Sequence, residues 1–155
     1  MSIKPLKKSA LVWLVVVVLM QSAQAKTCDV STSGLAFGIY SPASAANRDT
    51  TGSVLITCNG NIRAELSLSV GNGTGASYSG GRKMTVSGGI ATLTYNLYTN
   101  PARTQVFGDG TDTSVTQQIN GNKSFSQPVY GRIPGAQRSA LSGSYVDTVV
   151  ITIEY

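Results

Sequence analysis

Residues that commonly perform catalysis are scarce in this chain. Its 155 residues include no histidine, two cysteines and seven acidic side chains. Without histidine, the commonest general base and metal ligand is missing, and neither a Ser/His/Asp nor a Cys/His set can form. The sequence therefore predicts no enzyme, no catalytic residue and no bound cofactor.

Two of the acids, Asp109 and Asp112, lie close together in a glycine-rich stretch and could contribute to a calcium loop. The stretch does not supply the number of oxygen ligands that Ca²⁺ requires, so we interpret both aspartates as turn-forming residues and expect no metal site. The two cysteines, Cys28 and Cys58, allow only one pairing. In an exported protein they predict a disulfide, whereas a metal-binding or catalytic cysteine would need histidine partners that the chain lacks.

The first 25 residues have the composition of a secretory signal peptide. Three lysines among the first eight residues precede an apolar run at 10–20, and Ala23-Gln24-Ala25 supplies a small-residue cleavage site. We expect cleavage between Ala25 and Lys26, which removes 25 of the 155 residues and leaves 130, enough for one domain at 26–155. The alternative is an uncleaved membrane anchor, but the apolar run is short for a bilayer span. We therefore expect no stable membrane insertion of the mature chain.

The charge does not favour an anionic partner. Three of the twelve basic residues lie in the signal segment, so nine basic residues face seven acids in the mature chain, a net charge of +2. Arg82-Lys83, Arg132 and Arg138 form separate patches, which we interpret as solvated surface. Neither nucleic acid nor an anionic lipid surface is expected as a partner.

The mature chain consists of short alternating runs separated by Gly, Asn, Ser and Pro. Apolar residues recur at every second position near 35–39, 54–58, 64–70, 84–86 and 93–97, and a further strand is expected at 124–133. The turn Cys58-Asn59-Gly60-Asn61 predicts a hairpin between its flanking runs, and Pro128 predicts an interruption of the run around it. Seven or eight strands without helical periodicity predict a single all-β sandwich.

The last eleven residues, 145–155, form the most strongly patterned run. One face carries Val149, Ile151, Ile153 and Tyr155, and the other carries Thr148, Thr152 and Glu154, with Val150 as the exception. An apolar strand at a sheet edge invites another strand to pair with it, which favours a protein partner over a small substrate. The alternative is an interior strand covered by the chain's own residues.

Six short motifs occur in order along the chain: Cys28 with Leu35–Pro42, Gly52–Cys58, Leu93–Tyr98, Phe107–Gly110, Val129–Ile133 and Gly143–Thr148. Together they resemble the spore coat protein U domain family over about residues 27–155. The domain is also similar to the subunits of archaic (Csu-type) chaperone–usher pili of Gram-negative bacteria.

The resemblance implies an immunoglobulin-like β-sandwich that lacks its last strand and leaves an apolar groove beside the terminal strand. It places Val149, Ile151, Ile153 and Tyr155 at this groove. A periplasmic chaperone fills the groove during export through an usher, and a neighbouring pilin-like subunit then replaces the chaperone strand by β-augmentation. The Cys28–Cys58 bridge would tie the first strand to the second. The implied protein is a secreted structural subunit of a surface assembly, with roles in adhesion or biofilm.

Predicted cleavage leaves only Lys26 and Thr27 ahead of Cys28, too few residues for a donor strand. We therefore expect a chain that accepts a strand without donating one from its N-terminus, as a tip or terminal subunit does. One alternative is a stand-alone spore or cyst coat protein. Another is an adhesin-like module that binds a sugar or surface through Tyr78 and Phe107. A secreted hydrolase fits least, because the chain lacks a base and a metal set.

Overall fold

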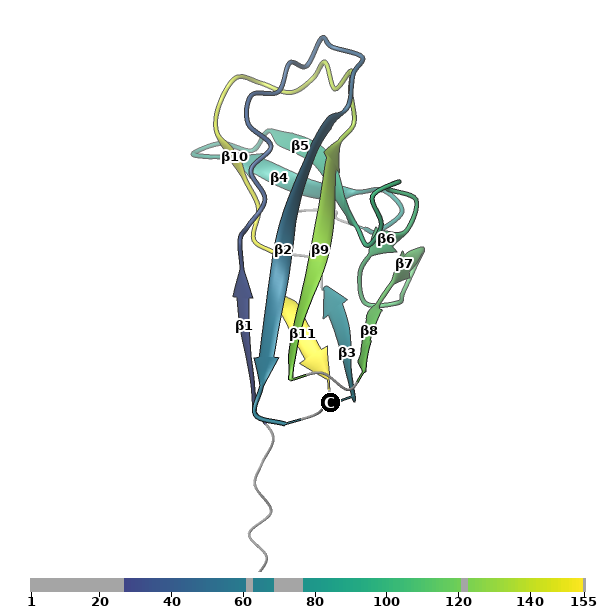
Figure 1. The fold of residues 1–155 in the computed structure, drawn as a ribbon. Coiled ribbons are helices and arrows are strands. Elements are labelled where there is room, and N and C mark those ends of the chain that lie inside the picture. Colours follow the sequence, from purple (N-terminus) through teal and green to yellow (C-terminus); the bar gives the residue numbers. More distant parts are fainter. Residues whose placement is uncertain (1–26, 61–62, 69–76, 121–122, 155) are drawn as a thin grey trace, which may run out of the picture.

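A computed structural model describes residues 27–60, 63–68, 77–120 and 123–154, and the regular elements among them are all β-strands (Figure 1). In chain order these are β1 (Cys28–Thr32), β2 (Arg48–Cys58), β3 (Arg63–Leu68), β4 (Arg82–Val86), β5 (Thr92–Tyr98), β6 (Val106–Phe107), β7 (Ser114–Val115), β8 (Gln117–Asn120), β9 (Ser124–Ile133), β10 (Tyr145–Val146) and β11 (Ile151–Glu154). Within the described ranges, no helix is long and apolar enough to cross a membrane.

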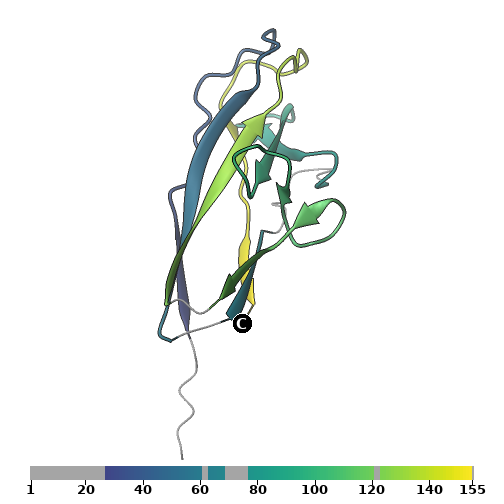
Figure 2. The same ribbon diagram turned by 45° about the vertical axis from the view of Figure 1, so that its right-hand side comes forward.

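The strands form two sheets. The larger has the order β1-β2-β9-β5-β4-β10, with β6 beside β5 and β7 beside β6, and the smaller has the order β11-β3-β8. Figure 2 shows the β1-β2-β9 layer on one side of the molecule and the β3, β8 and β11 strands on the other. The fold is therefore an all-β, immunoglobulin-like sandwich, as predicted.

Inward-facing side chains of the larger sheet form most of the core. In β2, Val54 and Ile56 are almost fully buried, while Leu55 between them is 41% exposed, which is the alternation of a strand with one face on the core. Among the residues whose burial is described, the other buried apolar residues are Cys58, Tyr78, Met84, Leu93, Tyr95, Leu97, Phe107, Ile119, Val129 and Ile133.

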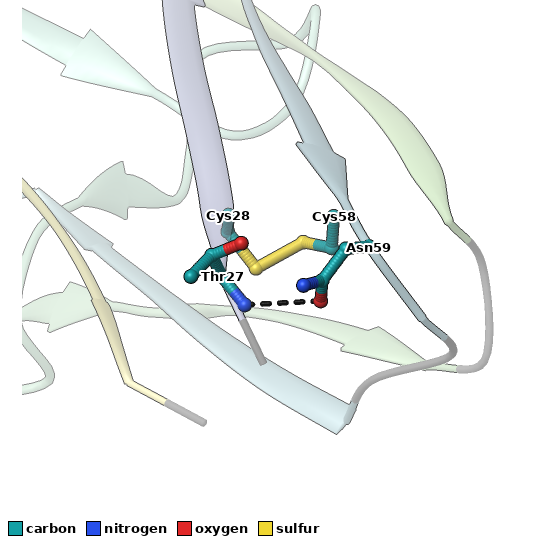
Figure 3. Close-up of a disulfide and its surroundings, with 4 residues drawn as sticks. All are labelled: Thr27, Cys28, Cys58 and Asn59. Atoms are coloured by element: carbon teal, nitrogen blue, oxygen red, sulfur yellow. Dashed lines mark hydrogen bonds between the residues drawn. A yellow bond between two sulfur atoms is a disulfide. The ribbon is translucent and has the colours of Figure 1, made fainter. Parts of the chain in front are cut away.

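The disulfide joins Cys28 of β1 to Cys58 of β2, which lie directly opposite each other in the antiparallel ladder (Figure 3). Their Cα atoms are 4.1 Å apart. The bridge lies at the end of the edge strand β1, where it holds that strand to β2. The predicted pairing of the two cysteines is confirmed.

The predicted hairpin around Asn59-Gly60 is wrong. β2 pairs with β1 and β9, whereas β3 pairs with β8 and β11 in the smaller sheet. The turn residue instead caps β1: the Asn59 backbone N–H donates to the Thr27 carbonyl at 3.1 Å, and the Thr27 N–H donates to Asn59 Oδ1 at 3.0 Å (Figure 3). Because both edges of β2 are occupied, the next strand enters the opposite sheet.

Pro128 does not interrupt β9, contrary to the prediction. The strand runs continuously and pairs with β2 from Ser124 to Ile133, with Pro128 opposite Ser53. On its other side β9 pairs with β5 only from Tyr130 to Arg132, so Pro128 lies outside that ladder. A proline is tolerated where no neighbouring strand needs its missing N–H.

The single terminal strand predicted at 145–155 is two strands in the structure. β10 pairs with β4 of the larger sheet and β11 pairs with β3 of the smaller, so residues 147–150 carry the chain from one sheet to the other. The alternation of partly buried and exposed side chains nevertheless continues without a break from Tyr145 to Glu154. Tyr155 lies outside the described residues.

Candidate functional site

A groove of about 780 Å³ opens between the segment that follows β1 and the segment that contains β10 and β11. Its floor consists of inward-facing core residues of the larger sheet, among them Val54, Leu97 and Val129. In Figure 1 the chain after β1 rises beside β2 to the top of the view, and the chain after β9 comes down from there through β10, before β11 lies lower down beside β3. The apolar core is therefore open along this side of the molecule.

The first wall is segment 33–40, which belongs to no strand. Leu35 and Phe37 lie over Gly131 of β9, where a Cβ atom would come within 2.8 Å of Leu35 Cδ2 and 2.7 Å of Phe37 Cζ. The Phe37 ring also meets Tyr95 edge to face, with centroids 5.9 Å apart. Glycine near the C-terminal end of β9 thus leaves room for the wall to cross the sheet.

This wall does not form the predicted strand. Its alternation ends at Gly38, whose φ of +69° turns the chain, so the Ile39 side chain is 92% exposed instead of facing inward. The Ser33 N–H donates to the Ser53 carbonyl. Beyond Ser33, no hydrogen bond donated by a backbone N–H of residues 34–40 is found among the described residues. The wall is held by side chains: Thr50 Oγ1 and Arg48 Nε donate to the carbonyls of Ala36 and Phe37 at 2.9 and 2.6 Å.

The second wall is formed by residues 145–154. Val149, Ile151 and Ile153 are partly buried against the core cluster, and Val149 and Ile151 line the groove. Among the described strands β11 pairs only with β3, so its other edge is open. In an antiparallel ladder, alternate residues of an edge strand direct their N–H and C=O groups away from the neighbouring strand. Three of the four predicted groove residues are therefore described, and they share one side of this wall.

One polar pair lies within the groove lining. The Tyr95 hydroxyl donates to Asp147 Oδ2 at 2.6 Å, and the Thr148 N–H donates to Asp147 Oδ1 at 2.9 Å. Burial, followed by the hydrogen bond to Asp147, raises the pKa of the Tyr95 hydroxyl well above its usual value, so this hydroxyl remains protonated. This bond joins the second wall to β5 on the floor.

Arg82 is buried, although the sequence suggested solvated surface. Its side chain is fully buried, with Nη1 donating to Asn96 Oδ1 at 2.7 Å and Nη2 to the Phe107 carbonyl at 2.6 Å. The guanidinium also lies over the Tyr78 ring, 5.1 Å from its centroid. Burial lowers the pKa of Arg82. The alternation in the sequence could have indicated this burial, because Arg82 lies two residues before the buried Met84 and on the same face of β4.

The other predicted surface cations are at least partly exposed. Arg132 Nε and Nη2 each donate to Asp49 at 2.8 Å, and Arg103 lies 3.4 Å from the same carboxylate. The hydrogen bond from Arg132 lowers the pKa of Asp49. Lys83 donates to Thr94 Oγ1, and Arg138 is exposed.

The predicted adhesive contacts are wrong, because Tyr78 is 5% exposed and Phe107 is completely buried. Asp109 accepts hydrogen bonds from the backbone and hydroxyl of Thr111, as expected for a turn residue. Asp112 has a φ of 54°, which suits a turn, and it accepts a hydrogen bond from the Ser79 N–H of a distant loop. In the described part of the chain, no group of three or more His, Cys, Asp or Glu residues could hold a metal ion.

The family model for the Spore Coat Protein U domain matches residues 14–152. Among solved structures, the chain is similar to one in the chaperone–tip adhesion subunit pre-assembly complex CsuC–CsuE, from the archaic chaperone-usher Csu pili of Acinetobacter baumannii. That match has 20% identity and a TM-score of 0.58, and it covers 84% of this chain but only 40% of the other. The E. coli Hda pilus minor tip subunit HdaB matches with 12% identity and a TM-score of 0.47, over 81% of this chain and 79% of that one. No curated protein matches the sequence significantly.

Proposed function

The chain belongs to the Spore Coat Protein U domain family, whose model spans residues 14–152, and we propose that it is an exported structural subunit of a chaperone–usher pilus-type assembly. In this proposal the groove receives a β-strand from another protein. The strand comes first from a periplasmic chaperone and later from a neighbouring subunit. The observation that supports it best is an apolar groove floored by core residues and bordered by the open edge of β11.

The geometry suits an extended strand better than a small molecule. Residues 145–153 of the second wall would span roughly 30 Å at about 3.3 Å per residue. A strand of similar length could lie along this wall and pair with the open edge of β11 over residues 151–154, and the N–H groups of residues 34–40 offer donors along the opposite wall. Its alternate side chains would cover Val54, Leu97 and Val129 on the floor. Main-chain pairing would supply affinity and the covered pockets specificity, as in other cases of β-augmentation.

The rim of the groove also favours a protein partner. Ile39, Leu141 and Val146 line the groove and are 92%, 64% and 63% exposed. Apolar side chains that are exposed around an apolar groove are more typical of an interaction site than of a free monomer surface. A bound chaperone or subunit would cover them together with the floor.

The position of the chain in an assembly remains a prediction from its N-terminal segment, since residues 1–26 lie outside the described residues. The same proposal has three further parts. The chain is exported by a signal peptide that is cleaved between Ala25 and Lys26, it receives a strand at a tip or terminus, and it contributes to adhesion or biofilm. Intact-mass measurement of the exported protein tests the cleavage site. A mature chain that starts well before Lys26 would contradict the receiving-only role.

The test of the groove is to supply the strand within one chain. A short glycine linker and an alternating strand, with valine at every inward position, are fused after the last residue and compared with a fusion in which serine replaces the valines. We expect the valine fusion to raise the midpoint of urea unfolding and the yield of monomer. Equal midpoints for the two fusions would overturn the proposal.

Matched substitutions locate the bound strand. Ile151→Asp places a charge on the groove side of the second wall and should abolish the gain from the valine fusion. Val150→Asp makes a similar change at a side chain that is 57% exposed, and should preserve the gain. Equal losses from both substitutions would indicate general destabilisation rather than a blocked groove.

A further inference from the structure

We infer that Asp147 is a specificity-determining residue of the groove: the strand that occupies it carries a hydrogen-bond donor opposite Asp147, and apolar side chains opposite Val149, Ile151 and Ile153. This inference rests on the proposed function, because it concerns the strand that the groove receives. It adds a polar requirement to a site that otherwise selects only for apolar residues.

The position of Asp147 in the second wall carries the argument. Partly buried side chains alternate along this wall in the order Tyr145, Asp147, Val149, Ile151 and Ile153. Among the described residues that line the groove, Asp147 is the only aspartate, glutamate, lysine or arginine. A strand paired with this wall would therefore meet three aliphatic side chains and then one carboxylate, spaced two residues apart.

The carboxylate has acceptor capacity left. Oδ2 accepts from the Tyr95 hydroxyl and Oδ1 from the Thr148 N–H, whereas a carboxylate offers about four lone-pair sites. Arg82 attracts Asp147 electrostatically, but its hydrogen bonds go to Asn96 and to the Phe107 carbonyl. The nearby cation thus balances part of the charge without occupying the remaining acceptor sites.

Filling the groove would remove water from this carboxylate. An apolar side chain opposite Asp147 would cover its free lone pairs and offer no replacement hydrogen bond, and an acidic one would add repulsion. A hydroxyl, amide or ammonium group would instead donate a charge-assisted hydrogen bond in a partly buried site. The occupied groove should therefore discriminate between strands that are equally apolar elsewhere.

The fused strand allows the comparison at one position. A strand that returns antiparallel to β11 would place its first inward residue near Ile153 and its fourth near Asp147. Threonine and valine are compared at the fourth inward position, because they have nearly the same shape and differ by a hydroxyl. The same exchange at the second inward position, near Ile151, is the control. Glutamine and glutamate form a second pair at the fourth position.

We expect threonine to be favoured over valine at the fourth position and disfavoured at the second, and glutamine to be favoured over glutamate at the fourth. In a double-mutant cycle with Asp147→Leu, the preference for threonine over valine should fall by about tenfold in the unfolding equilibrium constant. Asp147→Asn, which keeps an acceptor oxygen, should retain part of that preference. If Asp147→Leu does not fold, the comparisons of threonine with valine and of glutamine with glutamate in the unsubstituted chain still test whether the groove prefers a hydrogen-bond donor at this position.

The groove and the role of Asp147 are tested separately. If strand fusions stabilise the chain but threonine and valine behave alike at the fourth and second positions, the role of Asp147 is refuted and the groove remains. If the preference for threonine is unchanged by Asp147→Leu, the donor is recognised by another group and the inference is also refuted. If no valine-bearing fusion exceeds the serine control, the proposed function fails, and the inference fails with it.

Discussion

Gly52→Ala is the substitution that tests the first wall of the groove most sharply. Gly52 lies on the inward face of β2, where the chain that follows β1 crosses it. A Cβ atom built there would lie 2.3 Å from the Gly34 carbonyl oxygen and 3.1 Å from Leu35 Cγ. Since a contact of 2.3 Å is roughly 1 Å too short, the wall has to move away from the sheet.

The expected cost follows from two opposing effects. Overpacking of this kind costs about 1–3 kcal/mol, and replacing glycine by alanine within a strand returns about 0.5–1 kcal/mol. Moving the wall would also stretch the hydrogen bonds between Ser33 and Ser53, which measure 3.1 and 2.9 Å. We expect a net loss of about 1–2 kcal/mol in the free energy of unfolding, together with a smaller gain from a fused strand.

Urea unfolding of the strand-fused chain is the assay, with Gly60→Ala as the control. A Cβ atom at Gly60 would meet nothing within 4 Å, and its φ does not lie in the left-handed region, so this change should be nearly neutral. If Gly52→Ala proved as stable as Gly60→Ala, the segment after β1 would not cross β2 at this point. The description of the first wall would then be wrong.

Three further predictions concern the framework around the groove. Arg82→Met should cost about 2–4 kcal/mol, because it leaves two buried acceptors without their donor, whereas Arg138→Met at an exposed site should cost less than about 0.5 kcal/mol in the same urea titration. The pKa of Asp49 is lowered in the folded state. The ionised carboxylate therefore adds to the free energy of unfolding above about pH 4, and this stabilisation is lost as the pH falls further. Asp49→Asn should therefore be less stable by under about 1 kcal/mol at pH 7, and the difference should shrink progressively in urea titrations as the pH is lowered below about 4. Replacing Cys28 and Cys58 together by serine should cost roughly 3–4 kcal/mol, and reductant should lower the unfolding midpoint of the parent chain but not of this variant.

The alternation of apolar and polar residues predicted much of the larger sheet, because every second side chain of a strand points toward the core. The run at 93–97 corresponds to β5, and the run at 54–58 forms the end of β2. The same pattern predicted the partly buried series Val149, Ile151 and Ile153, even though the ladder changes sheet ahead of β11. Burial followed the pattern of side chains more closely than hydrogen bonding did.

The pairing of strands that are far apart in the chain could not be predicted from local sequence. Asn59 and Gly60 favour a turn in either a hairpin or a crossover, and the pairing of β2 with β1 and β9 decides between the two. Arg82 was wrongly predicted to be exposed, because its charge was given more weight than its position on the same face of the strand as Met84. Its burial depends on acceptors from Asn96 and Phe107, which lie 14 and 25 positions away in the sequence.

The groove itself could be inferred from the sequence only through the family resemblance. Its floor and its two walls come from segments far apart in the chain, and no single run of residues encodes an open side of a sandwich. The first wall was even predicted as an ordinary strand, because Leu35 and Phe37 alternate as strand residues do. Its departure from β2 depends on close packing around Gly52 and Gly131, which only the structure shows.

Amide hydrogen exchange, read residue by residue, tests the central claim most directly. It would be measured on the chain with the valine fusion and on the chain with the serine fusion. We predict that the valine strand slows exchange at alternate amides of residues 149–154, and at N–H groups of residues 34–40, while the β10 edge is unchanged. Protection confined to the β10 edge, or equal exchange in the two fusions, would contradict the claim that this groove accepts a β-strand.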